Sequence, residues 1–307
     1  MATVALTGAT GFLGGRLLRA LTARGWRVRA LMRRAADAAA LAGEDVNPVI
    51  GDLADELALK RLTEGADVTI HCAGLIKARD RAAFFAVNEG GAARLATASH
   101  GRLVLVSSLA ARAPELSDYA ASKRAGEEAS RLVAGDRLAV VRPPVIYGPG
   151  DRETLQLFRL AARWTVAPLP GAPAARLALA HADDVAAAVL DLIERPDLTG
   201  VYALGGDRPA GYAWAEIAAA AWRAVGRTPK LAPLPAWSIS AAAAISELAG
   251  PLQRSPPIFT RGKAREVLHP NWSVAEDELP PGGPAARFSL DAGFADAVAW
   301  YRQAGWL

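Results

Sequence analysis

A tyrosine and a lysine lie four positions apart, at Tyr119 and Lys123. On a helix this spacing places both side chains on one face, with their Cβ atoms about 5–6 Å apart. A neighbouring ammonium group favours the phenolate and lowers the pKa of a tyrosine from about 10 toward neutrality. A packed helical pair without chemistry is the alternative. We interpret Tyr119 as a general acid/base and Lys123 as the group that tunes its pKa.

Two serines follow the apolar run Val104–Val106, at Ser107 and Ser108. A serine hydroxyl at the end of a strand can donate a hydrogen bond to a substrate oxygen that a tyrosine protonates. The pattern therefore predicts a site for a carbonyl or an alcohol, in which Ser108 orients the substrate and Ser107 is the second choice. Asn88, on the preceding predicted helix, could join a proton relay. The equally weighted alternative is that Asn88 is an ordinary residue on the helix surface.

Three glycines, Gly8, Gly11 and Gly14, separate an apolar run from a helix-forming segment over 13–21. A strand, a tight turn and a helix in this order bring a helix N-terminus against a phosphate. Gly8 permits the turn, Gly11 lets the backbone approach a pyrophosphate, and Gly14 lets helix and strand pack closely. The flanking context favours dinucleotide binding over chance spacing. Further contacts are expected from Thr10, Phe12 and Leu13.

The end of the second strand indicates which dinucleotide is bound. An acidic residue there accepts hydrogen bonds from an unphosphorylated ribose, but this chain has Met32 followed by Arg33 and Arg34. A guanidinium binds a 2′-phosphate through two parallel hydrogen bonds. The sequence favours NADP(H) over NAD(H), with Arg33 as the first candidate; a solvated loop is the alternative.

Two further strand ends supply expected contacts to the dinucleotide. Asp52 and Leu53 follow the third strand, where a carboxylate could accept from the adenine amino group, although Asp after Gly is also common in turns. Cys72, Ala73 and Gly74 end the fourth strand, where small residues let a ring or ribose lie against the backbone. Both ends lie at the carboxyl edge of the sheet, where a doubly wound fold binds its ligand.

These residues need a parallel sheet to bring them together. Apolar strands are predicted at 4–6, 28–32, 46–50, 68–72, 103–106 and 138–142, separated by helices at 35–42, 55–63, 82–99 and 118–133. Repeated βα units predict an α/β fold with a doubly wound parallel Rossmann sheet. We expect 1–150 to form the NAD(P)-binding domain, with about 176–205 returning to it, and 151–307 to form a smaller substrate lobe. That lobe is expected to be mostly helical, with helices at 153–163, 183–194, 212–225, 236–249 and 291–303.

Composition excludes several other classes of protein. The 307 residues carry a net charge of +4 without a block of basic residues, so no nucleic-acid partner is expected. One cysteine excludes an internal disulfide, and the four histidines lack the spacing of metal ligands, so no metal is expected. The segment 236–250 is too short and too weakly apolar to span a bilayer. We expect a soluble cytoplasmic protein with a small-molecule substrate and no membrane partner.

The motifs together resemble the extended branch of the short-chain dehydrogenase/reductase superfamily. The resemblance rests on GATGFLG, HCAG, SSLAA, YAASK, RPPVIYGPG and HADDVA in this order, followed by FSLDAG and WYRQAGWL. It implies a sheet of about seven strands, a bound NAD(P), and Ser108, Tyr119 and Lys123 as the catalytic set, with Lys123 also touching the ribose. It further implies that Pro143, Val145 and Ile146 lie near the nicotinamide, that Asp184 anchors the substrate lobe, and that the two long helices form a homodimer seam.

Two departures from the family pattern bear on the substrate. Only ten residues separate Ser108 from Tyr119, and the segment from Arg176 to His181 lacks the aromatic residue that sugar-nucleotide epimerases carry. The favoured function is an NADP-dependent oxidoreductase acting on a carbonyl or secondary alcohol of a small, apolar substrate, in the manner of dihydroflavonol reductases or hydroxysteroid dehydrogenases. Four tryptophans favour an apolar substrate or form core: Trp164, Trp214, Trp222 and Trp237. An NAD-dependent nucleotide-sugar epimerase/dehydratase and a non-catalytic nucleotide-binding protein are the alternatives.

Overall fold

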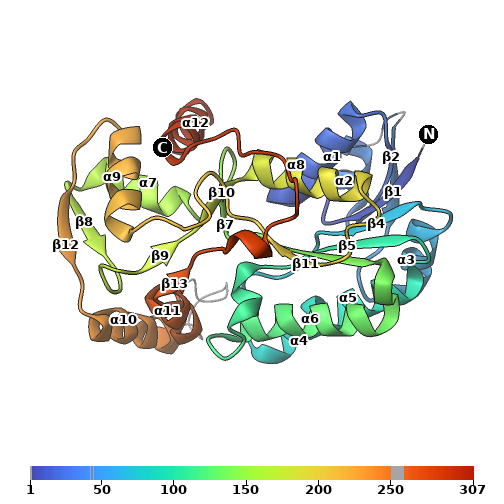
Figure 1. Ribbon diagram of the computed structural model, residues 1–307, viewed down its shortest axis with the longest axis horizontal. Coiled ribbons are helices and arrows are strands. Elements are labelled where there is room, and N and C mark those ends of the chain that lie inside the picture. The colour runs from blue at the N-terminus through green and yellow to red at the C-terminus, as the bar shows by residue number, and fades with distance from the viewer. Residues whose placement is uncertain (1, 42, 44, 250–258) are drawn as a thin grey trace. The chain divides into compact units, whose positions relative to one another are not determined.

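The computed structural model describes residues 2–41, 43, 45–249 and 259–307. Contacts divide the chain into two compact units (Figure 1). The first comprises Met1–Arg142, Ala186–Ala203 and Pro280–Pro284, and the second comprises Pro143–Val185, Leu204–Leu279 and Ala285–Leu307. The first unit thus consists of three separate stretches of chain.

A seven-stranded sheet in which every pairing is parallel forms the centre of the first unit, in the order β11-β6-β5-β4-β1-β2-β3. The strands are β1 (Thr3–Thr7), β2 (Arg27–Met32), β3 (Val46–Ile50), β4 (Val68–His71), β5 (Arg102–Val106), β6 (Leu138–Arg142) and β11 (Gly200–Ala203). The chain order reverses between β1 and β4, because Val4 pairs with Val28 on one side and with Val68 on the other. The expected doubly wound fold is therefore confirmed, and β1 and β4 flank the position where such folds bind ligands.

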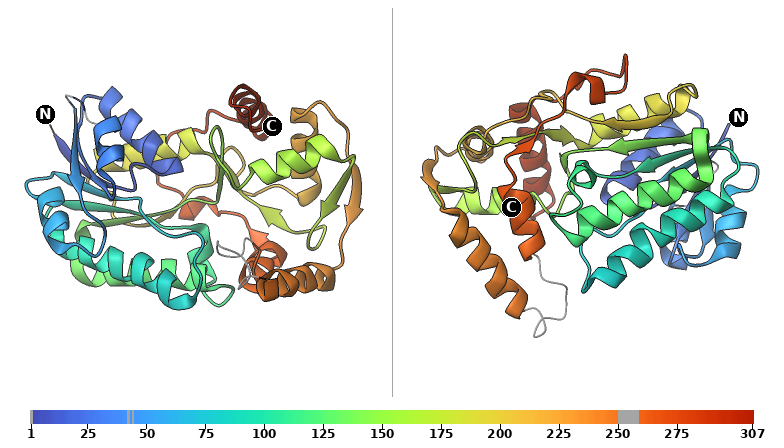
Figure 2. Two further views of the ribbon diagram at one scale, coloured as in Figure 1. Left: turned by 180° about the vertical axis from the view of Figure 1, so that it is seen from behind. Right: turned by 60° about the horizontal axis from the view of Figure 1, so that its bottom comes forward.

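Helices cover both faces of this sheet (Figure 2). One face carries α1 (Phe12–Ala23) and α8 (Ala182–Glu194), which are joined by an ion pair between Arg24 and Glu194 at 2.7 Å. The other face carries α3 (Glu56–Thr63), α4 (Arg81–Asn88), α5 (Gly90–Ala98) and α6 (Asp118–Ala134), and the short α2 (Ala35–Leu41) packs on β2 and β3. Strands covered on both faces need continuous apolar runs, and Val4, Ala5 and Leu6 are indeed fully buried.

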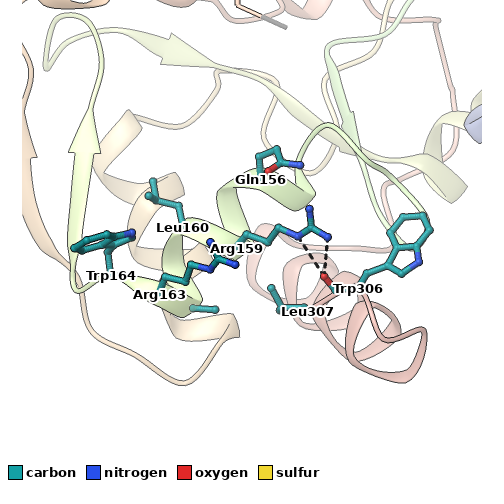
Figure 3. A pocket seen from close by; sticks show the side chains of 8 residues that line it. Gln156, Arg159, Leu160, Arg163, Trp164, Trp306 and Leu307 are labelled. Carbon is teal, nitrogen blue, oxygen red and sulfur yellow. Dashed lines mark hydrogen bonds between the residues drawn. The ribbon is translucent and has the colours of Figure 1, made fainter. Parts of the chain in front are cut away.

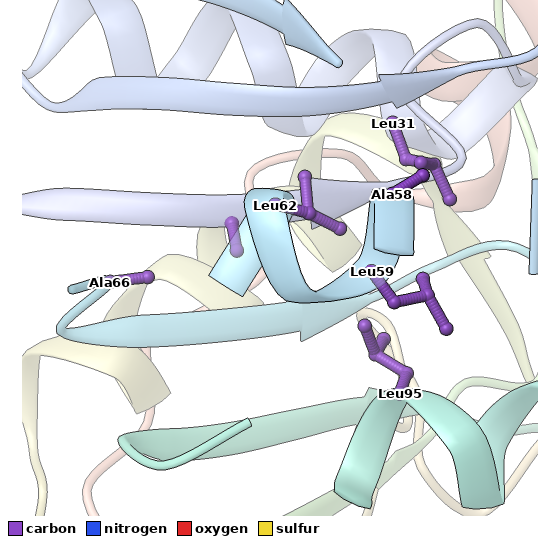
Figure 4. Close-up of a cluster of buried hydrophobic side chains, with 7 residues drawn as sticks. Leu31, Ala58, Leu59, Leu62, Ala66 and Leu95 are labelled. Carbon is purple, nitrogen blue, oxygen red and sulfur yellow. The ribbon is translucent and has the colours of Figure 1, made fainter. Parts of the chain in front are cut away.

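Leucines of α3 fill the core beneath this second face (Figure 4). Leu59 and Leu62 are completely buried against Leu31 of β2 and Leu95 of α5. Full burial of a leucine side chain stabilises the fold by roughly 1.5–3 kcal/mol. This packing holds β1, through Ala5, and β2, through Leu31, against α3.

Two elements of the first unit differ from expectation. The single helix predicted over 82–99 is two helices, α4 and α5, interrupted at Glu89. Gly90 and Gly91 follow at once, and glycine destabilises a continuous helix. A larger residue would not fit at position 91 without a shift, because a Cβ atom there would lie 2.8 Å from Cδ1 of Leu53. The seventh strand, β11, was not located from the sequence. It pairs with β6 although 57 residues separate Arg142 from Gly200.

The second unit contains more strand than was predicted. Its helices are α7 (Leu155–Arg163), α9 (Trp214–Ala224), α10 (Ala236–Ala249), α11 (Arg261–Leu268) and α12 (Leu290–Gln303). Three two-stranded parallel sheets join them: β7 (Val145–Tyr147) with β10 (Leu179–His181), β8 (Val166–Leu169) with β12 (Lys230–Pro233), and β9 (Arg176–Leu177) with β13 (Asn271–Trp272). Strands of two to four residues leave little periodicity in a sequence.

The tryptophans of this unit differ in their surroundings. Trp222 is completely buried and its Nε1 donates to the carbonyl oxygen of Trp164 at 2.8 Å, so this residue is core. Trp214 is half-buried, whereas the side chains of Trp164 and Trp237 are exposed. Within the described part of the chain, every helix is too short or too polar to cross a bilayer.

Candidate active site

Tyr119 and Lys123 lie on α6, as the sequence predicted. The helix begins where the Ser117 side chain accepts a hydrogen bond from Ala120 N at 3.0 Å, which caps the free N-terminus. Tyr119 is therefore in the first turn, half-buried, with its ring 6.2 Å from that of Phe84. The cap fixes where the helix begins and therefore where on the first turn the Tyr119 side chain is attached.

Lys123 joins α6 to the end of β5. Its Nζ donates to the carbonyl oxygen of Val106 at 2.8 Å, and a Cβ atom placed on Gly74 would lie 3.7 Å from the same nitrogen. Burial lowers the pKa of Lys123 from 10.5 to about 8. The ammonium group thus lies between the carboxyl ends of β4 and β5, on the helix that carries the candidate acid/base.

The two serines at the end of β5 have different partners. The Ser108 side chain accepts a hydrogen bond from Ala110 N at 3.2 Å and so caps the short 3-10 helix Leu109–Arg112. Ser107 is buried, and among the described residues its Oγ has no hydrogen-bond partner. The choice of Ser108 as the orienting serine, with Ser107 as the second choice, stays a prediction.

Asn88 is a buried connector and not a surface residue. Its Oδ1 accepts from Leu75 N at 2.8 Å, and its Nδ2 donates to Leu75 O at 3.0 Å and to Ser122 Oγ at 2.9 Å. Ser122 immediately precedes Lys123. Asn88 therefore ties the loop after β4 to the part of α6 that carries the ammonium group, a role that the sequence left undecided.

The glycine turn has the geometry that a dinucleotide requires. Gly8 has φ +79°, in the region that only glycine adopts readily, and a Cβ atom on Gly14 would lie 1.9 Å from the carbonyl oxygen of Gly8. Helix α1 begins after Gly11 with no side-chain cap and no acidic residue in its first turn. Its backbone N–H groups and dipole therefore suit a pyrophosphate.

Residues around this turn are placed as follows. Thr10 and Gly11 are exposed, Phe12 is half-buried, and the Leu13 side chain packs in the core. Only the backbone of Leu13 is therefore suited to touch a ligand. These residues fit the predicted dinucleotide contacts, which stay a prediction.

The two arginines after β2 are not equivalent. Arg34 forms two hydrogen bonds with the Asp37 carboxylate, at 2.8 and 2.7 Å, whereas Arg33 is exposed and has no hydrogen bond among the described residues. Met32 is buried at the strand end. Of the two guanidinium groups, Arg33 is thus the one free to bind a phosphate.

The loop after β3 makes contacts that stabilise its own fold. The Asp52 Oδ1 accepts from Ala54 N at 2.8 Å and from Asp55 N at 3.2 Å, a turn of the kind noted as the alternative for this residue. Leu53 is half-buried, and its carbonyl oxygen accepts from Arg94 Nε at 2.7 Å. Contact of Asp52 and Leu53 with the adenine stays a prediction.

The end of β4 is held by a residue that the sequence analysis missed. Thr7 Oγ1 lies 2.7 Å from Nδ1 of the buried His71 and accepts from Ala73 N at 3.2 Å. Burial, together with the charge of Lys123, lowers the pKa of His71 from 6.5 to about 3, so the ring is neutral; burial also raises the pKa of the Cys72 thiol to about 12. A polar residue that ends an apolar strand just before a glycine turn is the signal that could have indicated Thr7.

Other predicted residues belong to the second unit. Pro143, Val145 and Ile146 lie at β7 and the segment before it. Asp184, at the start of α8, accepts from Arg287 N at 3.1 Å and Phe288 N at 3.2 Å, so it anchors a distant segment of the same unit.

The second unit also has a surface hollow of about 510 Å³ beside α7 (Figure 3). It is lined by Gln156, Arg159, Leu160, Ala162, Arg163, Trp164, Trp306 and Leu307. Arg159 donates to the carbonyl oxygen of Trp306. None of the predicted catalytic or dinucleotide-binding residues lines this hollow.

Comparisons with known proteins agree with this geometry. The model of the NAD dependent epimerase/dehydratase family matches residues 4–205. A ceramide reductase of Caulobacter vibrioides is 47% identical over 99% of this chain and 96% of its own length. The crystal structure of gox2253 superimposes with a TM-score of 0.76 at 26% identity, covering 100% and 99% of the two chains. MoeE5, solved with UDP-glucose and NAD, has the same fold, with a TM-score of 0.72 at 21% identity over 99% of each chain.

Proposed function

Because this chain belongs to the NAD dependent epimerase/dehydratase family and is an NAD(P)-dependent oxidoreductase, we propose that it reduces a ketone of a ceramide-class lipid with NADPH. The substrate class is proposed from the relative named ceramide reductase, whose similarity extends over nearly the whole of both chains. Ceramides are long-chain amides with hydroxyl groups, and reduction of a ketone yields such a hydroxyl. The expectation from the sequence, an apolar substrate that carries a carbonyl group, agrees with a ceramide-class lipid.

The observation that carries the proposed chemistry is the position of Lys123. Lys123 follows Tyr119 by one turn of α6, and its ammonium group is fixed by the Val106 carbonyl at the strand end. A positive charge on the same helix face favours the phenolate that remains after proton donation. The same arrangement would serve oxidation of an alcohol, in which Tyr119 takes the proton.

The proposed mechanism assigns one task to each group of residues. When bound, NADPH supplies the hydride that reaches the ketone carbon. Tyr119 donates the proton to the ketone oxygen, and a serine at the end of β5, Ser108 in our proposal, orients that oxygen. The turn at Gly8, Gly11 and Gly14 would hold the pyrophosphate, and Arg33 the 2′-phosphate.

We also propose a cytoplasmic location and a homodimer. The proposed seam uses the outer surfaces of the helices at 82–99 and 118–133, which are α4, α5 and α6. Helix α6 exposes Leu132, with 88% of its surface accessible, and Val133. Sedimentation of a Leu132→Asp variant would test the seam, since a monomer is expected where the parent chain is a dimer.

The test is reduction of an oxo-ceramide by the purified protein, measured as NADPH consumption and formation of the hydroxyl product. The Tyr119→Phe variant keeps the ring beside Phe84 but lacks the proton donor, so kcat should fall by about 10²–10⁴. Tyr202→Phe is the control and should keep its activity, because the Tyr202 hydroxyl donates to the backbone carbonyl of Thr199 at 2.9 Å.

Other results would favour the two alternatives. A tightly held NAD that survives dialysis, with turnover of nucleotide sugars, would replace the proposal with an epimerase or dehydratase. Dinucleotide binding without turnover of either substrate class would indicate a non-catalytic protein.

A further inference from the structure

The outward face of α10 is apolar and uncharged. Trp237, Ala241 and Ile245 follow one another at four-residue spacing and therefore form one stripe along the helix. All three are exposed, with 73% of the surface of Trp237 and 67% of that of Ile245 accessible. No charged residue occurs from Ala236 to Ser246. Within the described residues, most of the surface of these side chains is thus not covered by other parts of the chain.

The opposite side of α10 is packed against other apolar side chains, and this burial stabilises the helix. Ile239 and Ala243 pack against Ala264 of α11, with Leu234, Phe259 and Leu268 around them. The views in Figures 1 and 2 agree that α10 and α11 lie side by side. The exposed stripe is therefore a second apolar face on a helix that already has a buried one.

Cations accompany this stripe, whereas acidic residues are scarce. Helix α11 runs antiparallel to α10, because Arg261 at its start pairs with Glu247 near the end of α10 at 3.4 Å. The exposed charged side chains of α11 are Arg261, Lys263 and Arg265. Two of these cations have acidic partners, since Arg261 pairs with Glu247 and Lys263 pairs with Glu266 at 3.0 Å. The exposed Lys230 begins β12, the strand that precedes α10. On α10, α11 and the strand before them, Lys230, Arg261, Lys263 and Arg265 thus outnumber Glu247 and Glu266, and the net positive charge suits an anionic surface.

We propose that the stripe of α10 docks on the surface of an anionic lipid bilayer. A helix of 14 residues is about 21 Å long, shorter than the roughly 30 Å hydrocarbon core, so it lies in the plane of the interface. Tryptophan is the side chain most enriched at headgroup level, and nearby cations are attracted by anionic lipids. No membrane partner was expected from the sequence because the segment cannot span; docking on the surface does not require a span.

A second copy of the chain fits the stripe less well. One face of a helix about 21 Å long and 10 Å wide offers roughly 200 Å², whereas a stable protein interface buries about 800 Å² per partner. A bilayer needs no matching shape, because lipid chains adapt to each inserted side chain. The size of the stripe therefore favours lipid over a folded partner.

The proposal goes beyond the proposed function and does not depend on it. Docking requires neither NADPH nor turnover, so failure of the ketone reduction test leaves it intact. A ceramide-class substrate would, however, be dissolved in a bilayer, and docking would bring the enzyme to it.

The experiment is flotation of the full-length protein with vesicles of phosphatidylcholine containing about one-third phosphatidylglycerol, at about 0.15 M salt. We expect the protein to float with these vesicles and to bind pure phosphatidylcholine vesicles more weakly. The double variant Trp237→Ser, Ile245→Ser should partition at least tenfold less, because it loses both large apolar side chains of the stripe.

The matched control is Leu57→Ser, Ile76→Ser, which removes two exposed apolar side chains of the first unit. It should float like the parent chain, and circular dichroism should show both double variants folded. Absence of flotation by the parent chain, or equal flotation by the α10 variant, would overturn the proposal. Loss of self-association in the α10 variant, without vesicle binding by the parent, would instead identify a second copy as the occupant.

Discussion

Lys123 is the residue that we propose sets the acid–base behaviour of this site. Removal from water disfavours its charged form, which lowers the pKa to about 8, and the Val106 carbonyl holds the nitrogen in place. At neutral pH the group is still mostly charged, so α6 carries a cation one helical turn from Tyr119. A modest rise in pH removes that cation.

The first prediction at this scale concerns the pH dependence of ketone reduction. Below pH 8 Lys123 carries its proton, and above it the charge is lost, so kcat should fall as pH rises through about 8. In Lys123→Met the charge is absent at every pH. Its kcat should be lower by about 10²-fold and should lack the step near pH 8. An unchanged step in Lys123→Met would assign the titration to another group.

The second prediction concerns the choice of dinucleotide, and the chain offers its own control. Arg33→Ser should weaken NADPH binding at least tenfold, about 1.4 kcal/mol, and leave NADH binding nearly unchanged. Arg34→Ser removes a guanidinium that Asp37 already holds, so the ratio of the two affinities should stay close to that of the parent. Titrations followed by tryptophan fluorescence measure both. A parent chain that prefers NADH would contradict the NADP assignment.

Helix α1 and strand β1 form the element that we propose binds the dinucleotide. The helix starts so close to the strand that Gly14 lies against the carbonyl of Gly8. Close contact of this kind directs the first N–H groups of the helix toward one point, where a pyrophosphate can accept them. In our proposal the backbone N–H groups of this element bind the pyrophosphate without any charged side chain.

Replacement of one glycine should therefore affect both stability and binding. In Gly14→Ala the new methyl group would lie 1.9 Å from Gly8 O, so the backbone must move. We expect a loss of about 1–3 kcal/mol in the free energy of unfolding and much weaker NADPH binding. The neighbouring Gly15→Ala would place its methyl group 3.5 Å from Ala9 O, an ordinary contact, and should be neutral or slightly stabilising. Urea denaturation compares the two variants; equal losses would contradict the packing argument.

The sequence predicted long elements well and short ones poorly. Six strands of the sheet and the Tyr119–Lys123 face of α6 follow from apolar runs and helical spacing. Strand β11 has only four residues. It is identified by its pairing with β6, and a local sequence pattern contains no information about that pairing. Similarly, Asn88 and Thr7 gain their roles from partners 34 and 64 positions away, so spacing alone could not assign them.

At the scale of the whole molecule, folding buries a titratable ring in the middle of the sheet. His71 is 2% exposed and is kept neutral, with a pKa of about 3, whereas in the unfolded chain it titrates near 6.5. The unfolded state therefore binds more protons between these two values. Lowering the pH from 6.5 toward 3 therefore shifts the folding equilibrium toward the unfolded state.

Acid should consequently destabilise the fold through this residue. As pH falls from 6.5 toward 3, the parent chain should lose up to about 1.4 kcal/mol per pH unit from His71, in total a few kcal/mol. His71→Gln cannot titrate and should show a shallower loss over the same range, although it is less stable at pH 7. Denaturant midpoints measured across this range test the difference in slope. Parallel curves would exclude His71 as the source.

The pairing of β6 with β11 also has a consequence for the newly made chain. Protein synthesis adds about 5–20 residues each second, so the ribosome needs roughly 3–12 s to extend the chain from Arg142 to Gly200. During this interval β6 is an open edge whose backbone N–H and C=O groups can pair with another nascent chain. Residues 280–284, which complete the first unit, emerge later still. Slower translation of 143–200 would thus prolong the time during which this edge of the sheet is exposed to aggregation.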